Sequence, residues 1–345
     1  MTDVRSKLLL ALLPATLLLA AAGCAPAPAG QADTITIGAY SVVREAFHDG
    51  LLPAFAAHWK AKTSREVRFV ESYNASGAQA RAIRAGLDAD LAVLSHEDDM
   101  DVLAKAGLIC ASWKDGPNKG VLTHSLVVIG YRDGNPRGIK DWADLAKPGV
   151  GVLYPDPKTS GGARWNINAI FGAALLAPGG GKQDPDGAWR FLASVQANVV
   201  NMDASGRQSV ANFERGTGDA LVTYENEILL RLKEGREIPY VIPPATLLIE
   251  GPAAIVDANV DKHGNRAVAE ALLAFLTSPE GQRILSEYGF RPIDPKLPDA
   301  TGRPLPPRLF TMKDLGGWEG VRDALYGPKG AWTTSFADLR RGKAR

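Results

Sequence analysis

The chain has 345 residues, which is enough for two domains of ordinary size. Its 46% hydrophobic and 22% charged content are typical of a globular protein. Because 39 Lys and Arg balance 38 Asp and Glu, the net charge is only +1. This balance excludes nucleic acid or an anionic membrane as a partner held by bulk charge, so any anion site must be local.

The two cysteines, Cys24 and Cys110, form no CxxC motif. A cysteine-rich zinc site and a disulfide framework are therefore excluded. The five histidines show no spacing typical of a metal site, and we expect no metal and no cofactor. We expect Cys110, which lies between Ile109 and Ala111, to be a small buried hydrophobic residue.

The N-terminus has the pattern of a secretory signal peptide over residues 1–23. Arg5 and Lys7 precede an apolar run at 8–22 that is short for a membrane span. Small residues then lead into Cys24, which resembles the bacterial lipobox, in which this cysteine is lipidated; Ala21 stands where leucine is usual. Residues 24–32 are predicted to be a lipidated tether, which places the protein in the periplasm or on the cell surface. Secretion without a lipid is the alternative.

Strand-like and helix-like segments alternate along the rest of the chain. We expect strands at 34–40, 67–70, 91–94, 124–131, 150–153, 199–203 and 220–224. Helices are expected between them, with Pro53 causing a kink or break in the first and Ser278-Pro279 starting a late one. The alternation predicts an α/β fold with mixed, mainly parallel sheets flanked by helices.

Two long extended segments, 122–131 and 240–257, bracket the middle of the chain. We interpret them as two crossings between lobes. Lobe one is then 33–123 plus 248–345, and lobe two is 124–247. Two discontinuous lobes of this kind form a hinged clamp, with the ligand in the cleft at the carboxyl ends of the strands.

Small polar turns follow several of the expected strands. In the turn at 160–162, Ser160 is a good helix N-cap, and Gly161 and Gly162 let the backbone approach a small group closely. The first amide groups of a helix have no partner within the helix and attract anions. Similar junctions occur at Ser76 and Gly206. Ordinary strand–loop–helix connections are the alternative.

Four motifs carry a resemblance to a known family. They are Thr-Ser-Gly-Gly-Ala-Arg-Trp-Asn at 159–166, Phe-Glu-Arg-Gly-Thr-Gly-Asp at 213–219, Tyr-Glu-Asn-Glu at 224–227 and Ser-Pro-Glu-Gly-Gln at 278–282. With them the chain, from about 35 to 318, resembles the periplasmic sulfate- and thiosulfate-binding proteins of ABC importers. The resemblance implies a two-lobed type II periplasmic-binding-protein fold, no enzymatic activity, and a monomer that hands its ligand to a membrane permease.

In that family uncharged donors hold a dianion in a dry cleft. Carried over, the resemblance implies the Ser160 hydroxyl, the Gly161 and Gly162 amides, and the amides of Ser76 and Gly206 as donors. Tyr224 stands where the family has an indole donor, and Ser41 stands where it has an acidic residue. We expect Arg164 and Arg207 to brace the loops through salt bridges rather than to touch the anion.

The Tyr224 departure bears on specificity. A site made only of donors rejects a protonated oxyanion at a cost of about 1–3 kcal/mol, because the ligand proton finds no acceptor. A tyrosine hydroxyl can donate or accept. Tyr224 therefore either relaxes the discrimination against hydrogen phosphate or simply donates to sulfate, and the sequence leaves both open.

The first functional hypothesis is capture of sulfate or thiosulfate and its delivery to an ABC transporter permease. The alternative is the same clamp for another oxyanion, such as phosphate or molybdate. A secreted hydrolase with Ser76 or Ser160 as nucleophile is disfavoured, since the chain has no Gly-x-Ser-x-Gly elbow.

Overall fold

The structure, a computed structural model, describes residues 32–116, 118–177, 184–299, 301–330 and 332–334. These residues belong to one unit of the chain, Ala32–Arg345. The predicted signal peptide and Cys24 lie outside them. Within the described residues no helix has the length and apolar character needed to cross a membrane.

Ten strands of the described residues form one mixed sheet with the order β2-β1-β3-β9-β4-β7-β5-β6; β10 pairs with β9 and β8 with β4. Their bounds are β1 Asp33–Tyr40, β2 Val67–Asn74, β3 Leu91–Val93, β4 Val121–Tyr131, β5 Val152–Leu153, β6 Val199–Asn201, β7 Ala220–Tyr224, β8 Tyr240–Val241, β9 Ala245–Ile255 and β10 Arg308–Phe310.

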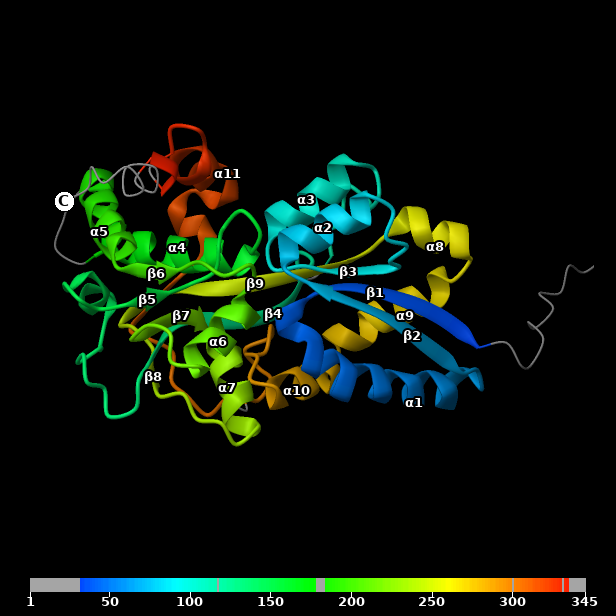
Figure 1. Cartoon of the computed structure of the whole chain (residues 1–345). Coiled ribbons are helices and arrows are strands. Elements are labelled where there is room, and N and C mark those ends of the chain that lie inside the picture. Colours follow the sequence, from blue (N-terminus) through cyan, green and yellow to red (C-terminus); the bar gives the residue numbers. More distant parts are fainter. Residues whose placement is uncertain (1–31, 117, 178–183, 300, 331, 335–345) are drawn as a thin grey trace, which may run out of the picture. The chain divides into compact units, whose positions relative to one another are not determined.

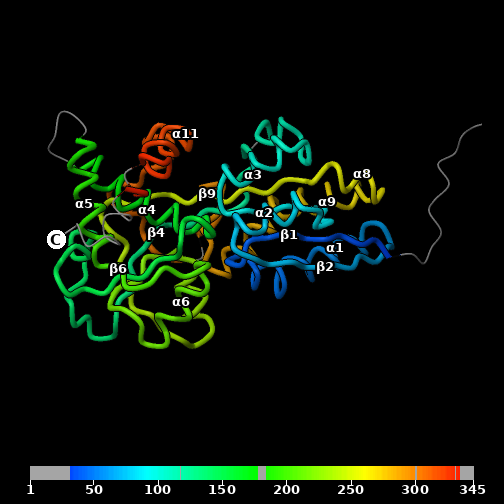
Figure 2. Tube along the Cα trace, turned by 45° about the horizontal axis from the view of Figure 1, so that its top comes forward, coloured from blue at the N-terminus to red at the C-terminus, as the bar shows by residue number. Residues whose placement is uncertain are grey.

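Two groups of parallel strands are joined by two long antiparallel ones. β1 runs parallel to β2 and β3, and β5 runs parallel to β6 and β7. β4 and β9 pair with each other, and each also pairs with one group, β9 with β3 and β4 with β7. The two extended segments of the sequence are thus the strands that run from one group to the other (Figures 1 and 2). The predicted mixed α/β architecture is confirmed.

Helices cover both faces of the sheet (Figure 1). Their bounds are α1 Leu52–Thr63, α2 Ser76–Arg84, α3 Glu97–Lys105, α4 Gly161–Leu175, α5 Pro185–Ala197, α6 Gly206–Glu214, α7 Glu225–Lys233, α8 Asp257–His263, α9 Arg266–Thr277, α10 Pro279–Glu287 and α11 Gly317–Val321. Short turns of other helical types are η1 Ser41–Val43, η2 Ala46–Leu51, η3 Trp142–Ala146, η4 Met312–Leu315 and η5 Arg322–Tyr326. Helices α2, α4 and α6 each follow a parallel strand, so their N-termini lie at the carboxyl ends of β2, β5 and β6.

Proline and capping residues mark the ends of several helices. Pro53 lies in the first turn of α1, and the wide π-type turn η2 precedes it, which is the break that the missing proline amide predicts. Ser278 caps α10 by accepting a hydrogen bond from the Gly281 amide at 3.2 Å. Ser41, by contrast, is not an N-cap, because it is the first residue of η1 and its side chain makes no capping bond.

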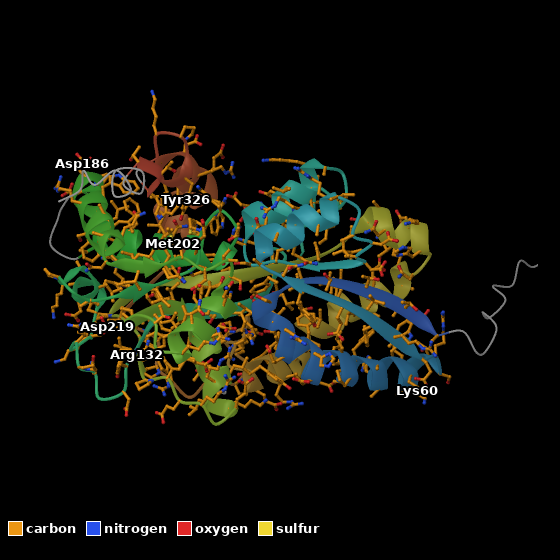
Figure 3. All side chains as sticks on the ribbon, in the orientation of Figure 1. Lys60, Arg132, Asp186, Met202, Asp219 and Tyr326 are labelled. Carbon is orange, nitrogen blue, oxygen red and sulfur yellow. The ribbon has the colours of Figure 1, made fainter. Side chains whose placement is uncertain are left out.

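The C-terminal segment packs onto the helices near the middle of the sheet. The Trp318 ring stacks on His96 with centroids 4.5 Å apart and meets Trp165 edge-on at 4.8 Å. The Tyr326 hydroxyl donates to Asn168 Oδ1 of α4 at 2.8 Å. Figure 3 labels Tyr326 among the side chains. Phe310 and Trp318 of this segment are both buried.

The expectation that Cys110 is buried is wrong. Ile109 takes the buried position after α3, and Cys110, the next residue, is exposed with its Sγ 2.9 Å from Ser112 Oγ. Ile109 fills the place in the buried cluster with Met100 and Leu103 at this bend, so the next residue, Cys110, lies at the surface.

Candidate anion-binding site

The turns that follow β1, β2, β3, β5, β6 and β7 meet around one small cavity. Its volume is ≈ 20 Å³, which is about the space of one water-sized group. It is lined by Tyr40, Ser41, Val42, Ala75, Ser76, Ser95, Pro155, Ser160, Gly162, Asn166, Ser205, Gly206, Thr223, Tyr224 and Glu227. Six of the seven predicted anion-binding residues are among them, and Gly161 is not.

Ser160 precedes α4 with its hydroxyl uncommitted. Its backbone is extended (φ −108°, ψ 121°), the usual N-cap conformation, but the side chain makes no capping bond. Its amide donates to Asp156 O at 2.9 Å, which fixes the turn. Ser160 is buried, and its hydroxyl bonds to no other described residue. A buried hydroxyl in this state is suited to a ligand, because leaving it unpaired is costly.

Gly161 allows close packing between loops and does not line the cavity. A Cβ added there would lie 2.7 Å from Ser95 Oγ and 2.7 Å from His96 Cδ2, so no larger residue fits. The first turn of α4 can therefore reach the loop after β3, and Gly162, one residue on, faces the cavity.

At the start of α2, the Ser76 hydroxyl is hydrogen-bonded to other residues, whereas the Ser76 amide has no partner within the helix. Ser76 Oγ donates to Asp99 Oδ2 at 2.6 Å and accepts from the Ser95 amide at 2.8 Å. Ser76 is the first residue of α2, so its own amide has no partner within the helix. Because the hydroxyl proton goes to a carboxylate and not to an imidazole, Ser76 lacks the base that a serine nucleophile needs.

At α6 the cap is conventional. Ser205 Oγ accepts from the Gln208 amide at 3.2 Å, and Gly206 begins the helix. A Cβ added to Gly206 would meet nothing within 4 Å, so this residue borders open space. The partial positive charge of this helix start, like those of α2 and α4, favours an anion in the cavity.

Tyr224 ends β7 and is hydrogen-bonded to a residue that the sequence did not single out. Its hydroxyl lies 2.8 Å from Ser95 Oγ, and both side chains are buried. Burial raises the pKa of Tyr224 well above 10, so the hydroxyl keeps its proton. Ser95 follows β3 as Ser76 follows β2. Its position after a short buried strand is the sequence signal that could have identified Ser95 as a cavity residue.

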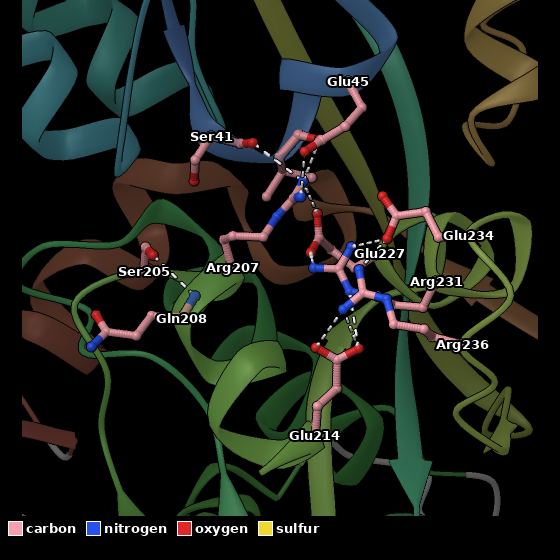
Figure 4. A network of polar contacts seen from close by, with 11 residues as sticks. Ser41, Glu45, Ser205, Arg207, Gln208, Glu214, Glu227, Arg231, Glu234 and Arg236 are labelled. Carbon is pink, nitrogen blue, oxygen red and sulfur yellow. Dashed lines mark hydrogen bonds and ion pairs between the residues drawn. The ribbon is translucent and has the colours of Figure 1, made fainter.

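The two arginines do not line the cavity themselves, and both form ion pairs with carboxylates. Arg207 of α6 makes two 2.8 Å bonds to the Glu45 carboxylate and one of 2.9 Å to Glu227, and it reaches Ser41 O at 3.3 Å (Figure 4). Arg164 pairs with Asp98 at 3.2 Å. The guanidinium of Arg207 thus connects the turn after β1 to helices α6 and α7.

One carboxylate, Glu227, lies in the cavity wall. Burial raises its pKa, and the charges of Arg207 and Arg231 oppose that rise. Among the described residues no group of three or more His, Cys, Asp or Glu is placed to hold a metal ion.

Comparisons with known proteins agree with this geometry. Residues 35–291 match the family model of the bacterial extracellular solute-binding proteins. The chain is 42% identical to a sulfate-binding protein of Synechococcus elongatus over 88% of this chain and 86% of that one. It is 35% identical to a thiosulfate-binding protein of Pseudomonas aeruginosa, covering 84% and 91%. The sulfate-binding protein SubI of Mycobacterium tuberculosis has a similar structure, with TM-score 0.78, 34% identity, and coverage of 85% and 99%.

Fold and cavity together define a two-lobed α/β periplasmic binding protein, the fold class predicted from the sequence. The chain belongs to the family of bacterial extracellular solute-binding proteins. That family binds solutes and is not a family of enzymes, which removes the serine hydrolase hypothesis.

Proposed function

We propose that this chain captures sulfate or thiosulfate in the cavity described above. The observation that carries the proposal is the meeting of three helix starts, those of α2, α4 and α6, at one small buried space. Unpaired amides at helix starts bind anions without any counter-ion in contact. The names of the relatives, sulfate-binding and thiosulfate-binding proteins, support this choice of anion.

In this proposal the Ser160 hydroxyl and the amides of Gly162, Ser76 and Gly206 donate to the anion. Ser41 and Tyr224 complete the wall. We leave the Gly161 amide out of the donor set, because Gly161 does not line the cavity and packs against Ser95 instead. Arg164 and Arg207 brace the loops through their ion pairs with Asp98, Glu45 and Glu227.

We further propose that residues 33–123 plus 248–345 form one lobe, that 124–247 form the other, and that the lobes close on the anion. The antiparallel pairing of β4 with β9 between the two strand groups supports this division. Small-angle scattering tests it: the radius of gyration of the mature chain falls when sulfate is added. A radius that does not change with saturating sulfate contradicts closure.

Calorimetry of the mature chain tests which anion is the ligand. Sulfate, thiosulfate, phosphate and molybdate are titrated separately. We expect the tightest binding for sulfate or thiosulfate. Tighter binding of phosphate or molybdate would favour the alternative, the same clamp for another oxyanion.

We also propose that the chain is a monomer, anchored to the membrane through lipid on Cys24, and that it delivers the anion to an ABC transporter permease. Small residues before Cys24 and membership of a family of extracellular binding proteins support the anchor. In cells, Cys24→Ala should move the protein from the membrane fraction to the released fraction. An unchanged membrane fraction would refute the lipid anchor.

A further inference from the structure

Residues 308–326, near the end of the chain, contact both of the proposed lobes. Strand β10 pairs with β9 at Ala245–Leu247, and η4, α11 and η5 then lie beside α4 (Figures 1 and 2). Chain order groups this segment with lobe one, because it follows residue 248. Its contacts, however, divide between α4, which belongs to lobe two, and the start of α3, which belongs to lobe one.

The contacts of this segment with α4 are buried and lie along the helix. Phe310 packs so closely on Gly172 that a Cβ added there would lie 2.5 Å from Phe310 Cε2. Asn168 Nδ2 donates to Met312 Sδ at 3.4 Å, and Asn168 Oδ1 accepts from the Tyr326 hydroxyl at 2.8 Å. Phe310 and Met312 are both buried, so separating the segment from α4 would expose apolar surface. The segment should therefore move together with α4.

The contacts with the start of α3 are fewer and lie at the boundary between the lobes. Trp318 stacks on His96 with ring centroids 4.5 Å apart, and Arg322 forms an ion pair with Asp98. Asp98 also pairs with Arg164 of α4 at 3.2 Å. The start of α3 therefore meets two surfaces at once, α4 and the C-terminal segment.

This boundary directly adjoins the anion cavity. Ser95, which lines the cavity, precedes His96 in the chain. Ser95 O accepts a hydrogen bond from Trp165 Nε1 of α4 at 2.9 Å, and both residues are buried. Because Ser95 and Trp165 belong to different proposed lobes, this bond can exist only while the lobes are closed. Among the described residues that line the cavity, neither Trp318 nor Arg322 is found.

We propose that residues 308–326 form a latch, which moves with lobe two and contacts the start of α3 when the lobes close, so that Trp318 and Arg322 slow the release of the anion. The inference rests on the proposed function, and it moves 308–326 from lobe one to lobe two of the division given there. Opening breaks the stack on His96 and the ion pair with Asp98, while the contacts on α4 remain. Trp318 and Arg322 are positioning residues, because they stabilise the closed state without touching the anion.

Stopped-flow kinetics of sulfate binding to the mature chain test the latch. Arg322→Gln removes one ion pair of Asp98 and leaves the pair with Arg164. We expect the release rate to rise about two- to fivefold, the range that a partly exposed ion pair allows. Trp318→Leu should raise it about two- to tenfold through loss of the aromatic stack. The association rate should not change, because the latch is not engaged in the open state.

The matched control is Arg308→Gln. Arg308 lies on the same segment, but its guanidinium donates to Leu176 O at the end of α4 and not to lobe one. We expect both rates of this variant to equal those of the wild type. Asp98→Asn tests the partner, since Arg322→Gln should have little further effect in that background. Thermal unfolding shows whether each variant is folded.

A second measurement needs no ligand. The Trp165 indole proton is buried in its bond to Ser95 O, so its hydrogen exchange, followed by NMR in the anion-free chain, reports opening. We expect faster exchange in Arg322→Gln and Trp318→Leu than in the wild type, and no change in Arg308→Gln.

Two kinetic results would overturn the inference while leaving the proposed function intact. One is a wild-type release rate in both Arg322→Gln and Trp318→Leu. The other is a slower association with unchanged release, which would mean that these residues act on the open state. If the wild type binds none of the four anions, the proposed function fails and the indole exchange decides. Faster exchange in both variants then supports the latch, and equal exchange refutes it.

Discussion

The Ser160 hydroxyl is the side-chain group in the cavity that most directly reports on anion binding. It is buried, makes no capping bond and bonds to no other described residue. Ser160→Ala should therefore weaken sulfate binding by about 1–3 kcal/mol, the usual cost of losing a hydrogen bond to a charged group. Calorimetry measures the change, with the exposed Ser194→Ala as the control. Equal affinities in wild type and Ser160→Ala would remove this hydroxyl from the site.

Two glycines at helix starts should respond differently to the same substitution. Gly161→Ala places a methyl group 2.7 Å from both Ser95 Oγ and His96 Cδ2, whereas Gly206→Ala meets nothing within 4 Å. We expect Gly161→Ala to lower the free energy of unfolding by about 1–3 kcal/mol through overpacking. Gly206→Ala should change it by only a few tenths of a kcal/mol. Urea unfolding of the two variants decides, and equal losses would contradict the packing argument.

Ser95 shows why single residues were incompletely predicted. The sequence marked Ser76, Ser160 and Gly206 because small residues there precede clear helical periodicity. Ser95 precedes His96 and an acidic helix start, a pattern that is equally typical of an ordinary cap. Only the approach of Tyr224 from a strand 129 positions later makes Ser95 part of the wall.

Among the helices and strands, those with a strong local pattern were predicted best. β7 has the predicted bounds, 220–224, because its residues form one continuous buried run of strand-favouring side chains. Helix α8 and strand β10 were not predicted. Both are short, and short elements acquire their stability from packing rather than from their own sequence.

The C-terminus of α8 should make stability depend on pH. His263 Nδ1 lies 2.7 Å from Asp90 Oδ1 and Nε2 lies 3.0 Å from Asp88 Oδ2. These carboxylates raise the pKa of His263, because only the imidazolium donates from both nitrogens. The contribution is fully present below the unfolded-state pKa and is lost as pH rises through the higher folded-state pKa.

We therefore expect His263→Gln to cost on the order of 1 kcal/mol at pH 6 and less at pH 8. Urea unfolding at several pH values measures the difference between wild type and variant. Taking this difference cancels the opposite contributions of His96 and His124, whose pKa values burial lowers. A difference that grows as pH rises would contradict the assignment.

At the level of the complete fold, Arg207 connects segments that are far apart in the sequence. Its guanidinium binds Glu45 after β1 and Glu227 on α7, and Glu227 is buried. Without Arg207, the buried Glu227 keeps only its longer 3.8 Å ion pair with Arg231, and we expect a cost at the lower end of the about 3–5 kcal/mol that breaking a buried ion pair costs. Arg207→Met should be destabilised by about that amount.

The double variant Arg207→Met, Glu227→Gln should recover a large part of this loss, because no buried charge is left alone. Chemical denaturation of the two single variants and the double variant completes the cycle. A double variant no more stable than Arg207→Met would show that the ion pair with Glu227 is not what Arg207 contributes.

The amino-acid sequence by itself determined the alternation of strands and helices, the two long crossing segments and the small polar turns at which helices begin. These properties depend on neighbours a few positions apart, through side-chain periodicity, caps and proline. Only the tertiary structure decided that six of these turns meet at one cavity, that Gly161 packs while Gly162 lines, and that Ser95 and Glu227 stand in the wall. Those facts depend on strand order and on contacts between residues more than sixty positions apart, which no local pattern encodes.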